Sequence, residues 1–513
     1  MAKINLDALI RREDFEVEEV ISSGKKKETL SIEDIKSDSF FFSNLRKPDF
    51  QRETNEWEGQ RIAELIRSFI TGDLIPAVIL WRSAGGYLFV IDGSHRLSAL
   101  SAWVNNDYGD GDTSKAFYEG ILPEEQLAAA STTRRLVERA VGPYADFRLA
   151  LTHPDKVRPD IVKYAKNLGA LAIQLQWVEG DARKAEISFF KINQQAAPID
   201  KTELRLLEER RKPNSIAARA VIRSGKGHKY WSVFDESIQT QIQDLAAEIN
   251  HILFAPRLEK PIKTLDLPVA GKLYSAQTLP LIVDMITIVS NQDNKSDDLD
   301  GAATVSVLKD VRRVAYILNS NNASSLGLHP AVYFYSQEGR HKSASFLAVI
   351  DFVSRLGARR KLNDFIDVRD QFEEFLLGHD YLVQQINRKH RTAQASHPFI
   401  SFFFDEVLSA LKGGAAVAEV TKQLQGSEKF GYLSMQEPAL VRGQPGKKFD
   451  TEGKSAVYLR EVLQRAPRCA ICKGYVHRNS ISIDHIERRR DGGSSSVDNG
   501  QLSHPYCNTG YKN

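Results

Sequence analysis

Two pairs of metal-binding residues stand near the C-terminal end of the sequence. Cys469 and Cys472 form a Cys-x-x-Cys pair, and His504 and Cys507 form a His-x-x-Cys pair. A tetrahedral Zn²⁺ takes four thiolate or imidazole ligands, often as two such pairs. The sequence has three cysteines, all of them here, and an odd number does not suit a disulfide framework. We expect a closed structural zinc site; the alternative is a set of buried cysteines without a metal.

A second group of reactive side chains lies between the two pairs. Residues 481–485 alternate apolar and polar types and end in Asp484 and His485, which predicts a strand carrying an acid and an imidazole at its end. Metal-assisted phosphodiester hydrolysis needs a base for water and a site for a hard cation. An imidazole can be the base near pH 7, and carboxylate and amide oxygens can hold the cation. His485 is the candidate base, Asp484 and Asn508 are candidate ligands, and Asn499 either holds the loop or orients the imidazole.

The order and spacing of these residues resemble the zinc-ribbon kind of HNH endonuclease. Over residues 469–508 the sequence has the Cys-x-x-Cys, an Asp-His-Ile, a Gly-Gly turn, an Asn before the second zinc pair and an Asn directly after its last Cys. The resemblance implies a ββα-metal fold, in which the strand of His485 pairs with a second strand and a helix presents Asn508. It also implies one catalytic Mg²⁺ or Mn²⁺ at Asp484 and Asn508, separate from the structural Zn²⁺.

Two positions depart from that family pattern. His504 stands where many members have Cys, which zinc tolerates, and the basic residue usually found shortly after the last Cys is displaced to Lys512. From residue 451 onward ten Lys or Arg stand against six Asp or Glu, an excess of four, whereas the whole chain has a net charge of only +3. Arg488, Arg489 and Arg490 are therefore candidate DNA-phosphate contacts, with a solvated charged surface as the alternative.

A third constellation lies in the N-terminal part of the chain. Residues 91–97, IDGSHRL, place Asp92 and Gly93 at a strand end and Ser94, His95 and Arg96 at a helix start. The free N–H groups of such a junction and its nearby cations suit a phosphate. The same pattern is also a common strand–helix connector.

The residues flanking this turn resemble the N-terminal domain of GmrSD-type restriction enzymes, which is related to the ParB and sulfiredoxin-like fold. They are PDFQRETNEW (48–57), GDLIP (72–76) and FFKINQQAAPIDKTEL (189–204). The family turn usually reads DGQQR and is implicated in nucleotide binding or hydrolysis; here Ser94 and His95 replace the two Gln. No P-loop motif occurs. Carried over by position, the nucleotide pocket comprises Gln51, Arg52, Asp92, Gly93, His95, Arg96 and Asn193.

Hydrophobic periodicity indicates the elements that position these residues. In the N-terminal part it predicts a helix over 57–71; further helices are expected over 181–192 and from about Ser94. Runs rich in β-forming residues predict strands over 77–82, 87–92 and 171–179, the first two separated by a turn at Gly85 and Gly86. Residues 235–425 are dominated by helical spacing, residues 426–453 have linker composition, and a short helix is expected over about 455–466.

The expected fold class is multidomain α+β: a ParB-like α/β N-terminal domain, an all-helical middle domain and a C-terminal ββα-metal HNH domain with a zinc ribbon. The predicted division is a lead-in (1–44), a ParB-like nucleotide- or DNA-sensing domain (45–234), a helical spacer (235–425), a linker (426–453) and the nuclease domain (454–513).

Composition limits the remaining possibilities. With 42% hydrophobic and 26% charged residues, the chain is neither disordered nor fibrous. Its longest apolar runs are too short to span a bilayer, and the first residues do not form a secretory signal, so we expect a cytoplasmic protein with no membrane partner.

The residues and the HNH resemblance predict a metal-dependent DNA endonuclease. The GmrSD resemblance implies that a nucleotide- or modification-sensing domain gates it, and that it serves in bacterial restriction or anti-phage defence. Expected partners are DNA, with modified phage DNA, a nucleoside triphosphate effector and a homo-oligomer as candidates. The alternatives are an NTPase, and a nucleotide-switched DNA-binding protein whose zinc knuckle binds DNA without cutting.

Overall fold

The structure is a computed structural model, and the chain folds into two compact units. It describes residues 3–13, 25–48, 54, 57–118, 120, 122, 124–196, 201–226, 229–273, 278–290, 296–435 and 448–512. Unit 1 comprises residues 1–210 and 226–230, and unit 2 comprises residues 211–225 and 231–513. The five-part division expected from the sequence stays a prediction.

Unit 1 is built on a mixed six-stranded sheet. Its strands are β1 (Arg12–Glu13), β2 (Thr29–Ser31), β3 (Leu45–Pro48), β4 (Val78–Arg82), β5 (Leu88–Asp92) and β6 (Ala172–Val178), in the order β1-β3-β5-β4-β6-β2. The β4–β5 and β2–β6 pairs are antiparallel and the other three are parallel. The first 44 residues thus supply both edge strands.

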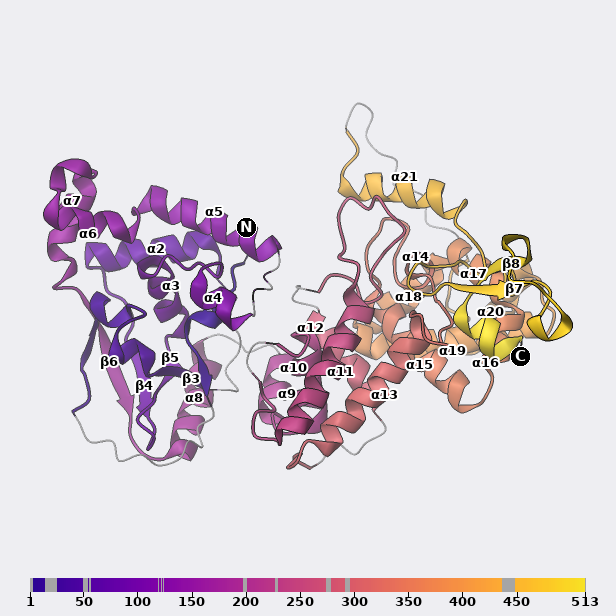
Figure 1. Cartoon of the computed structure of the whole chain (residues 1–513), viewed down its shortest axis with the longest axis horizontal. Helices are drawn as coiled ribbons and strands as arrows, with labels where there is room; N and C mark the ends of the chain where they lie inside the picture. The colour runs from indigo at the N-terminus through magenta and orange to yellow at the C-terminus, as the bar shows by residue number, and fades with distance from the viewer. Residues whose placement is uncertain are drawn as a thin grey trace. The chain divides into compact units, whose positions relative to one another are not determined.

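Side chains alternate between the two faces of this sheet, and each face is covered by helices (Figure 1). Val78, Leu80 and Val90 lie in the larger core with α2 (Gly59–Thr71) and α3 (Ser94–Val104), whereas Trp81 and Phe89 pack against α8 (Ala182–Ala196). The remaining helices of unit 1 are α1 (Phe40–Ser43), α4 (Asp112–Phe117), α5 (Glu124–Ala140), α6 (Tyr144–Thr152), α7 (Pro159–Leu168) and α9 (Lys201–Glu208). The predicted elements of this region are confirmed.

Unit 2 is mainly helical. Its helices are α10 (Pro213–Ile222), α11 (Glu236–Phe254), α12 (Thr278–Val289), α13 (Ala302–Leu318), α14 (Pro330–Tyr333), α15 (Ser343–Ala358), α16 (Leu362–Asp367), α17 (Arg369–Gly378), α18 (Asp380–His390), α19 (Ala393–Lys412), α20 (Val417–Gly426) and α21 (Thr451–Leu463). The helical reading of 235–425 is confirmed. In the core Phe352 of α15 stacks on Phe372 of α17, and both rings meet Phe404 of α19 edge to face.

The segment after α21 is part of unit 2. Strands β7 (Ser482–His485) and β8 (Gly500–Ser503) form an antiparallel pair, as the resemblance implied. The expected helix after them is a single π-helical turn, η6 (Cys507–Tyr511). The short 3₁₀ turns of the chain are η1 (Asp7–Leu9), η2 (Ile32–Ile35), η3 (Pro154–Lys156), η4 (Arg489–Asp491) and η5 (Val497–Asn499).

The structure has both a sheet-containing unit and a helical unit, so the mixed α/β nature of the fold is confirmed. Among the described residues, no helix combines the length and the apolar character needed to cross a membrane.

Candidate functional site

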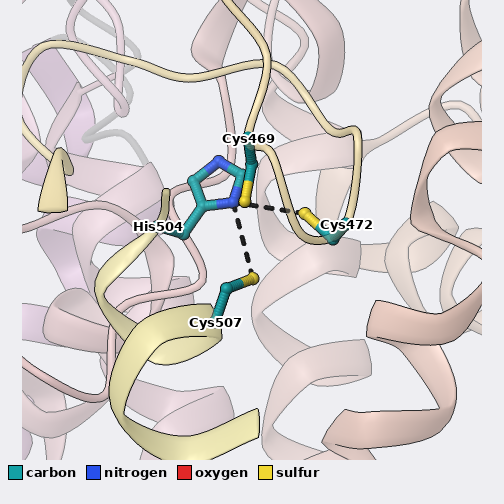
Figure 2. A group of neighbouring side chains, drawn as sticks. All are labelled: Cys469, Cys472, His504 and Cys507. Atoms are coloured by element: carbon teal, nitrogen blue, oxygen red, sulfur yellow. Dashed lines mark hydrogen bonds between the residues drawn. The ribbon is translucent and has the colours of Figure 1, made fainter. Parts of the chain in front are cut away.

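The two predicted zinc pairs meet in one buried cluster. Cys469, Cys472, His504 and Cys507 are all buried, and their ligand atoms lie within 4.8 Å of one another (Figure 2). Nδ1 of His504 lies 3.3 Å from Cys472 Sγ and 3.8 Å from Cys507 Sγ. Three sulfurs and one imidazole nitrogen form a donor set that fits a closed tetrahedral Zn²⁺ site.

Local backbone structure brings the four ligands together. Cys469 and Cys472 lie in a tight turn that two backbone hydrogen bonds close. The Cys469 N–H donates to the Gly474 carbonyl and the Lys473 N–H donates to the Cys469 carbonyl, each with a nitrogen–oxygen distance of 2.9 Å. Lys473 has a φ of 58°, in the left-handed region. His504 follows directly after β8, and Cys507 begins η6. The turn and the end of the hairpin thus each supply one pair.

The imidazole of His504 is oriented as a ligand. Its Nε2 lies 3.0 Å from the Tyr475 carbonyl oxygen, and a donated hydrogen bond there leaves Nδ1 as the ligand atom. Nδ1 faces the sulfurs and also lies 3.2 Å from Arg369 Nη1. Burial, and then the positive charge of Arg369, lower the pKa of His504. The ring is therefore neutral, as metal ligation requires.

A fully buried ion pair from α17 supports the cluster. Arg369 Nε donates to Glu373 Oε1 over 2.8 Å, and neither side chain has solvent exposure. Arg369 also donates to the carbonyls of Leu326 and Gly327, and Glu373 accepts the Tyr475 N–H over 2.8 Å. The pair thus fixes the backbone on both sides of the cluster. Sequence reasoning missed it, because Arg and Glu four residues apart occur on many helices.

Two glycines allow this close packing. A Cβ on Gly327 would lie 2.5 Å from Cδ2 of His504, and a Cβ on Gly474 would collide with the Arg369 guanidinium. The cluster is therefore embedded in the helical unit.

Asp484 and His485 lie at the end of β7, with their side chains on opposite sides of the strand. Asp484 is buried, and its Oδ2 accepts hydrogen bonds from Gln501 Nε2 (2.8 Å) and from Lys512 Nζ (2.6 Å). Lys512 also donates to the carbonyl of His485 over 2.6 Å. The His485 ring is half-buried, and its Nε2 lies 3.3 Å from Ser495 Oγ. The carboxylate is thus enclosed while the imidazole remains accessible.

The two candidate asparagines lie on either side of this strand end. Asn508 Nδ2 donates to Ser482 Oγ over 2.8 Å, so η6 is fastened to β7. Asn499 Oδ1 accepts the Glu487 N–H over 2.8 Å, and its Nδ2 donates to the carbonyls of Glu487 (3.0 Å) and Ser494 (2.7 Å). Of the two roles expected for Asn499, these contacts favour holding the loop.

The three consecutive arginines differ in their surroundings. Arg488 Nη2 donates to the Lys512 carbonyl over 3.0 Å, which closes the loop onto η6. Arg489 and Arg490 are exposed in η4 and form no ion pair within the described part of the chain. Sequence reasoning placed Lys512 near the motif only as a displaced basic residue; its contact with Asp484 requires the fold.

The N-terminal turn adopts the predicted strand–helix junction. Gly93 has a φ of 101°, which favours glycine, and a Cβ there would lie 2.9 Å from Cγ2 of Val78. Arg96 Nη2 donates to Asp92 Oδ2 (2.8 Å) and to the Ala77 carbonyl (3.0 Å). Asp92 and Arg96 are therefore paired with each other.

The rest of the predicted pocket is only partly described. The His95 ring stacks on Trp57 at 5.6 Å, and the Arg61 guanidinium lies 4.5 Å from the same indole. Gln51, Arg52 and the side chain of Asn193 lie outside the described residues. The structure thus brings together Asp92, Gly93, His95 and Arg96.

Comparison with known proteins identifies two domains. Residues 30–207 match the family model of the GmrSD restriction endonuclease N-terminal domain, and residues 469–513 match that of the HNH endonuclease. The architecture expected from the sequence is thereby confirmed, and the two domains support a nuclease in restriction-type defence that acts on DNA. No curated protein and no solved structure matches the chain.

Proposed function

We propose that this chain is a metal-dependent DNA endonuclease whose HNH centre is gated by its N-terminal domain. The observation that carries the proposal is the arrangement of Asp484, His485 and Asn508 around the end of β7, beside the cysteine–histidine cluster. Hydrolysis needs a base and a charge-neutralising site close together. This strand end offers both.

His485 is the proposed general base. Its half-buried ring is reachable from solvent, and Ser495 lies within 3.3 Å of Nε2. An imidazole takes up a proton near neutral pH, so it can deprotonate the water that attacks the scissile phosphate. Asn499 is proposed to act indirectly, by holding the loop that ends near Ser495.

Asp484 and Asn508 would hold the catalytic Mg²⁺ or Mn²⁺. Their oxygens are the hard ligands that these ions prefer. Gln501 and Lys512 both donate to Oδ2 of Asp484, so Oδ1 is the oxygen that would face the ion. When bound, the ion would neutralise charge on the phosphate and on the leaving 3′-oxygen. The buried cysteine–histidine cluster would hold a separate structural Zn²⁺.

The N-terminal domain would sense a nucleotide or a DNA modification. The N-terminal end of α3, where the helix dipole favours negative charge, lies beside Asp92 and Arg96. Nε of Arg96 is buried and has no hydrogen-bond acceptor among the described residues, which supports an anionic ligand such as a phosphate. Hydrolysis of a nucleoside triphosphate at this turn is a further part of the proposal.

One observation favours a second candidate, a nucleotide-switched DNA-binding protein or NTPase that does not cut DNA. The Asp484 carboxylate is satisfied by Gln501 and Lys512, as a purely structural carboxylate would be. In that case His485→Ala would leave all activity intact, whereas Asp92→Ala would abolish nucleotide turnover.

Cleavage in the presence and absence of metal tests the first candidate. Plasmid and modified phage DNA are incubated with the full chain and Mn²⁺, with and without nucleoside triphosphate, and then with excess chelator. We expect cleavage that requires added metal and is lost in Asp484→Asn. Metal-independent cleavage, or full activity of Asp484→Asn, would contradict the proposal.

A further inference from the structure

Three consecutive cations form an exposed loop in the helical unit. Arg359, Arg360 and Lys361, here called the basic loop, follow α15 directly. All three are exposed, and their side chains form no ion pair within the part of the chain that the structure describes. Within the described residues, their positive charges are therefore not neutralised by acidic side chains.

The helix that follows the basic loop is hydrogen-bonded to the segment that matches the HNH family model, residues 469–513. The basic loop leads into α16, where the Asn363 side chain accepts a hydrogen bond from Tyr506 Oη over 2.8 Å. At the other end of α16, Asp367 accepts one from Tyr511 Oη over 2.6 Å. Tyr506 and Tyr511 flank Asn508 in sequence, so α16 lies alongside the turn that carries this candidate ligand (Figure 1).

Chain geometry limits how far the basic loop lies from Asn508. Lys361 is two residues from Asn363, whose side chain is hydrogen-bonded to Tyr506, two residues before Asn508. Fully extended connections along this path span about 30 Å at most. That is less than one turn of duplex DNA, about 34 Å. A duplex at the HNH centre can therefore reach the basic loop.

The nearest acidic residues in sequence do not neutralise the loop. Asp364 and Asp367 of α16 are both paired with Lys412, at 3.4 and 2.7 Å. In residues 469–513, the segment that matches the HNH family model, Arg489 and Arg490 are also exposed. The helical unit and the hairpin thus each present unpaired cations close to the candidate catalytic centre.

The backbone of the loop adds an independent observation. Arg360 has a φ of 56°, a left-handed conformation that a glycine or asparagine would adopt at lower cost. This left-handed residue ends α15, and the Lys361 N–H donates to the Leu356 carbonyl over 2.8 Å, as at many helix C-termini. The backbone conformation therefore does not explain why an arginine stands at position 360.

We propose that the basic loop binds DNA phosphates beside the cut site, so that the helical unit forms part of the DNA-binding surface. This inference rests on the proposed nuclease function, since it takes DNA at the HNH centre as given. Each cation that contacts a phosphate releases about one counterion, which makes binding depend on salt.

Salt-dependent binding of the full chain tests the proposal. Binding of a fluorescent duplex of about 40 base pairs is followed by anisotropy between roughly 50 and 250 mM salt, in a His485→Ala background. For Arg359→Gln/Arg360→Gln we expect about tenfold weaker binding at 100 mM salt, and a slope of log affinity against log salt that is smaller by about 2. The matched control, Lys309→Gln/Lys422→Gln, removes the same charge from exposed positions on α13 and α20.

The outcomes separate the two proposals. An unchanged slope, an equal loss in the control pair, or no DNA binding at all would overturn the role of the basic loop. Failure of the nuclease proposal would instead be seen as absence of cleavage by the chain with His485 intact. Melting temperature and zinc content are measured for each variant, and both should be unchanged because the altered side chains are exposed.

Discussion

The buried pair of Arg369 and Glu373 makes a quantitative prediction about the helical unit and its cysteine–histidine cluster. Arg369→Met keeps the length of the side chain but removes its charge and its donors. Glu373 would then remain fully buried without its cation, and the carbonyls of Leu326 and Gly327 would each lose a donor. The helical unit should therefore become markedly less stable.

The magnitude follows from the complete burial of both side chains. Removing one partner of a buried ion pair costs about 3–5 kcal/mol. Glu373 retains hydrogen bonds from the Tyr475 N–H (2.8 Å) and from Tyr333 Oη (2.9 Å), which keeps the expected loss within that range. Such a loss raises the unfolded fraction by roughly two to four orders of magnitude. With an m-value of about 2 kcal/mol/M, the urea midpoint falls by about 2 M.

Release of bound zinc measures the unfolding of unit 2, the unit that contains Arg369 and Glu373. The cysteine–histidine cluster lies in unit 2. A colorimetric chelator present during urea unfolding therefore detects the unfolding of unit 2 and not that of unit 1. Arg355→Met is the matched control, because Arg355 is 23% exposed and pairs with the partly exposed Asp351 and Asp405. For this control we expect a loss of at most about 1 kcal/mol.

Two results would refute this reasoning. One is release of zinc from Arg369→Met at the urea concentration found for the unaltered chain. The other is an equal shift in Arg355→Met. A double variant, Arg369→Met/Glu373→Leu, should regain part of the lost stability, because it no longer buries an unpaired carboxylate.

Three further predictions concern the same unit. Cys507→Ser should lower bound zinc from one ion per chain to almost none, measured by atomic emission, and a full complement would contradict the cluster's role. Asn499→Ala should speed hydrogen exchange at the Glu487 amide, whose acceptor it removes, by about tenfold or more; equal exchange would show that the loop holds without it. Burial lowers the pKa of His477 to about 4, so below pH 6.5 the unfolded chain binds a proton there that the folded protein does not. Stability should fall by about 1.4 kcal/mol per pH unit from pH 6.5 towards 4. Urea unfolding of His477→Gln should show a free energy of unfolding that depends less steeply on pH over this range. An equally steep dependence in His477→Gln would contradict the role given to His477.

The cysteine–histidine cluster and the main strands could be predicted because their signals are local. The i, i+3 spacing of Cys469 and Cys472 fixes one side of a metal site whatever the rest of the fold does. In the same way, the β-rich runs over 77–82 and 87–92, separated by a Gly-Gly turn, predicted β4 and β5, and apolar residues at helical spacing over 57–71 predicted α2.

Other features depend on contacts between distant segments. Arg369 and Tyr475 are more than a hundred residues apart, and nothing in either neighbourhood indicates that Glu373 joins them. Strands β1 and β2 have only two and three residues, too few for a periodic pattern, so the first 44 residues gave no sign of the sheet edges. Lys512 reaches Asp484 only after the hairpin and η6 have folded together.

The most direct test of the nuclease assignment is the rate of DNA cleavage with and without His485. Single-turnover nicking is measured with Mn²⁺, on plasmid and modified phage DNA and with nucleoside triphosphate, for the unaltered chain and for His485→Ala. His153→Ala, at an exposed position in unit 1, serves as the control. We expect cleavage that falls by about a hundredfold or more in His485→Ala and is unchanged in the control. Equal cleavage by His485→Ala, or no cleavage of any substrate by the unaltered chain, would contradict the account.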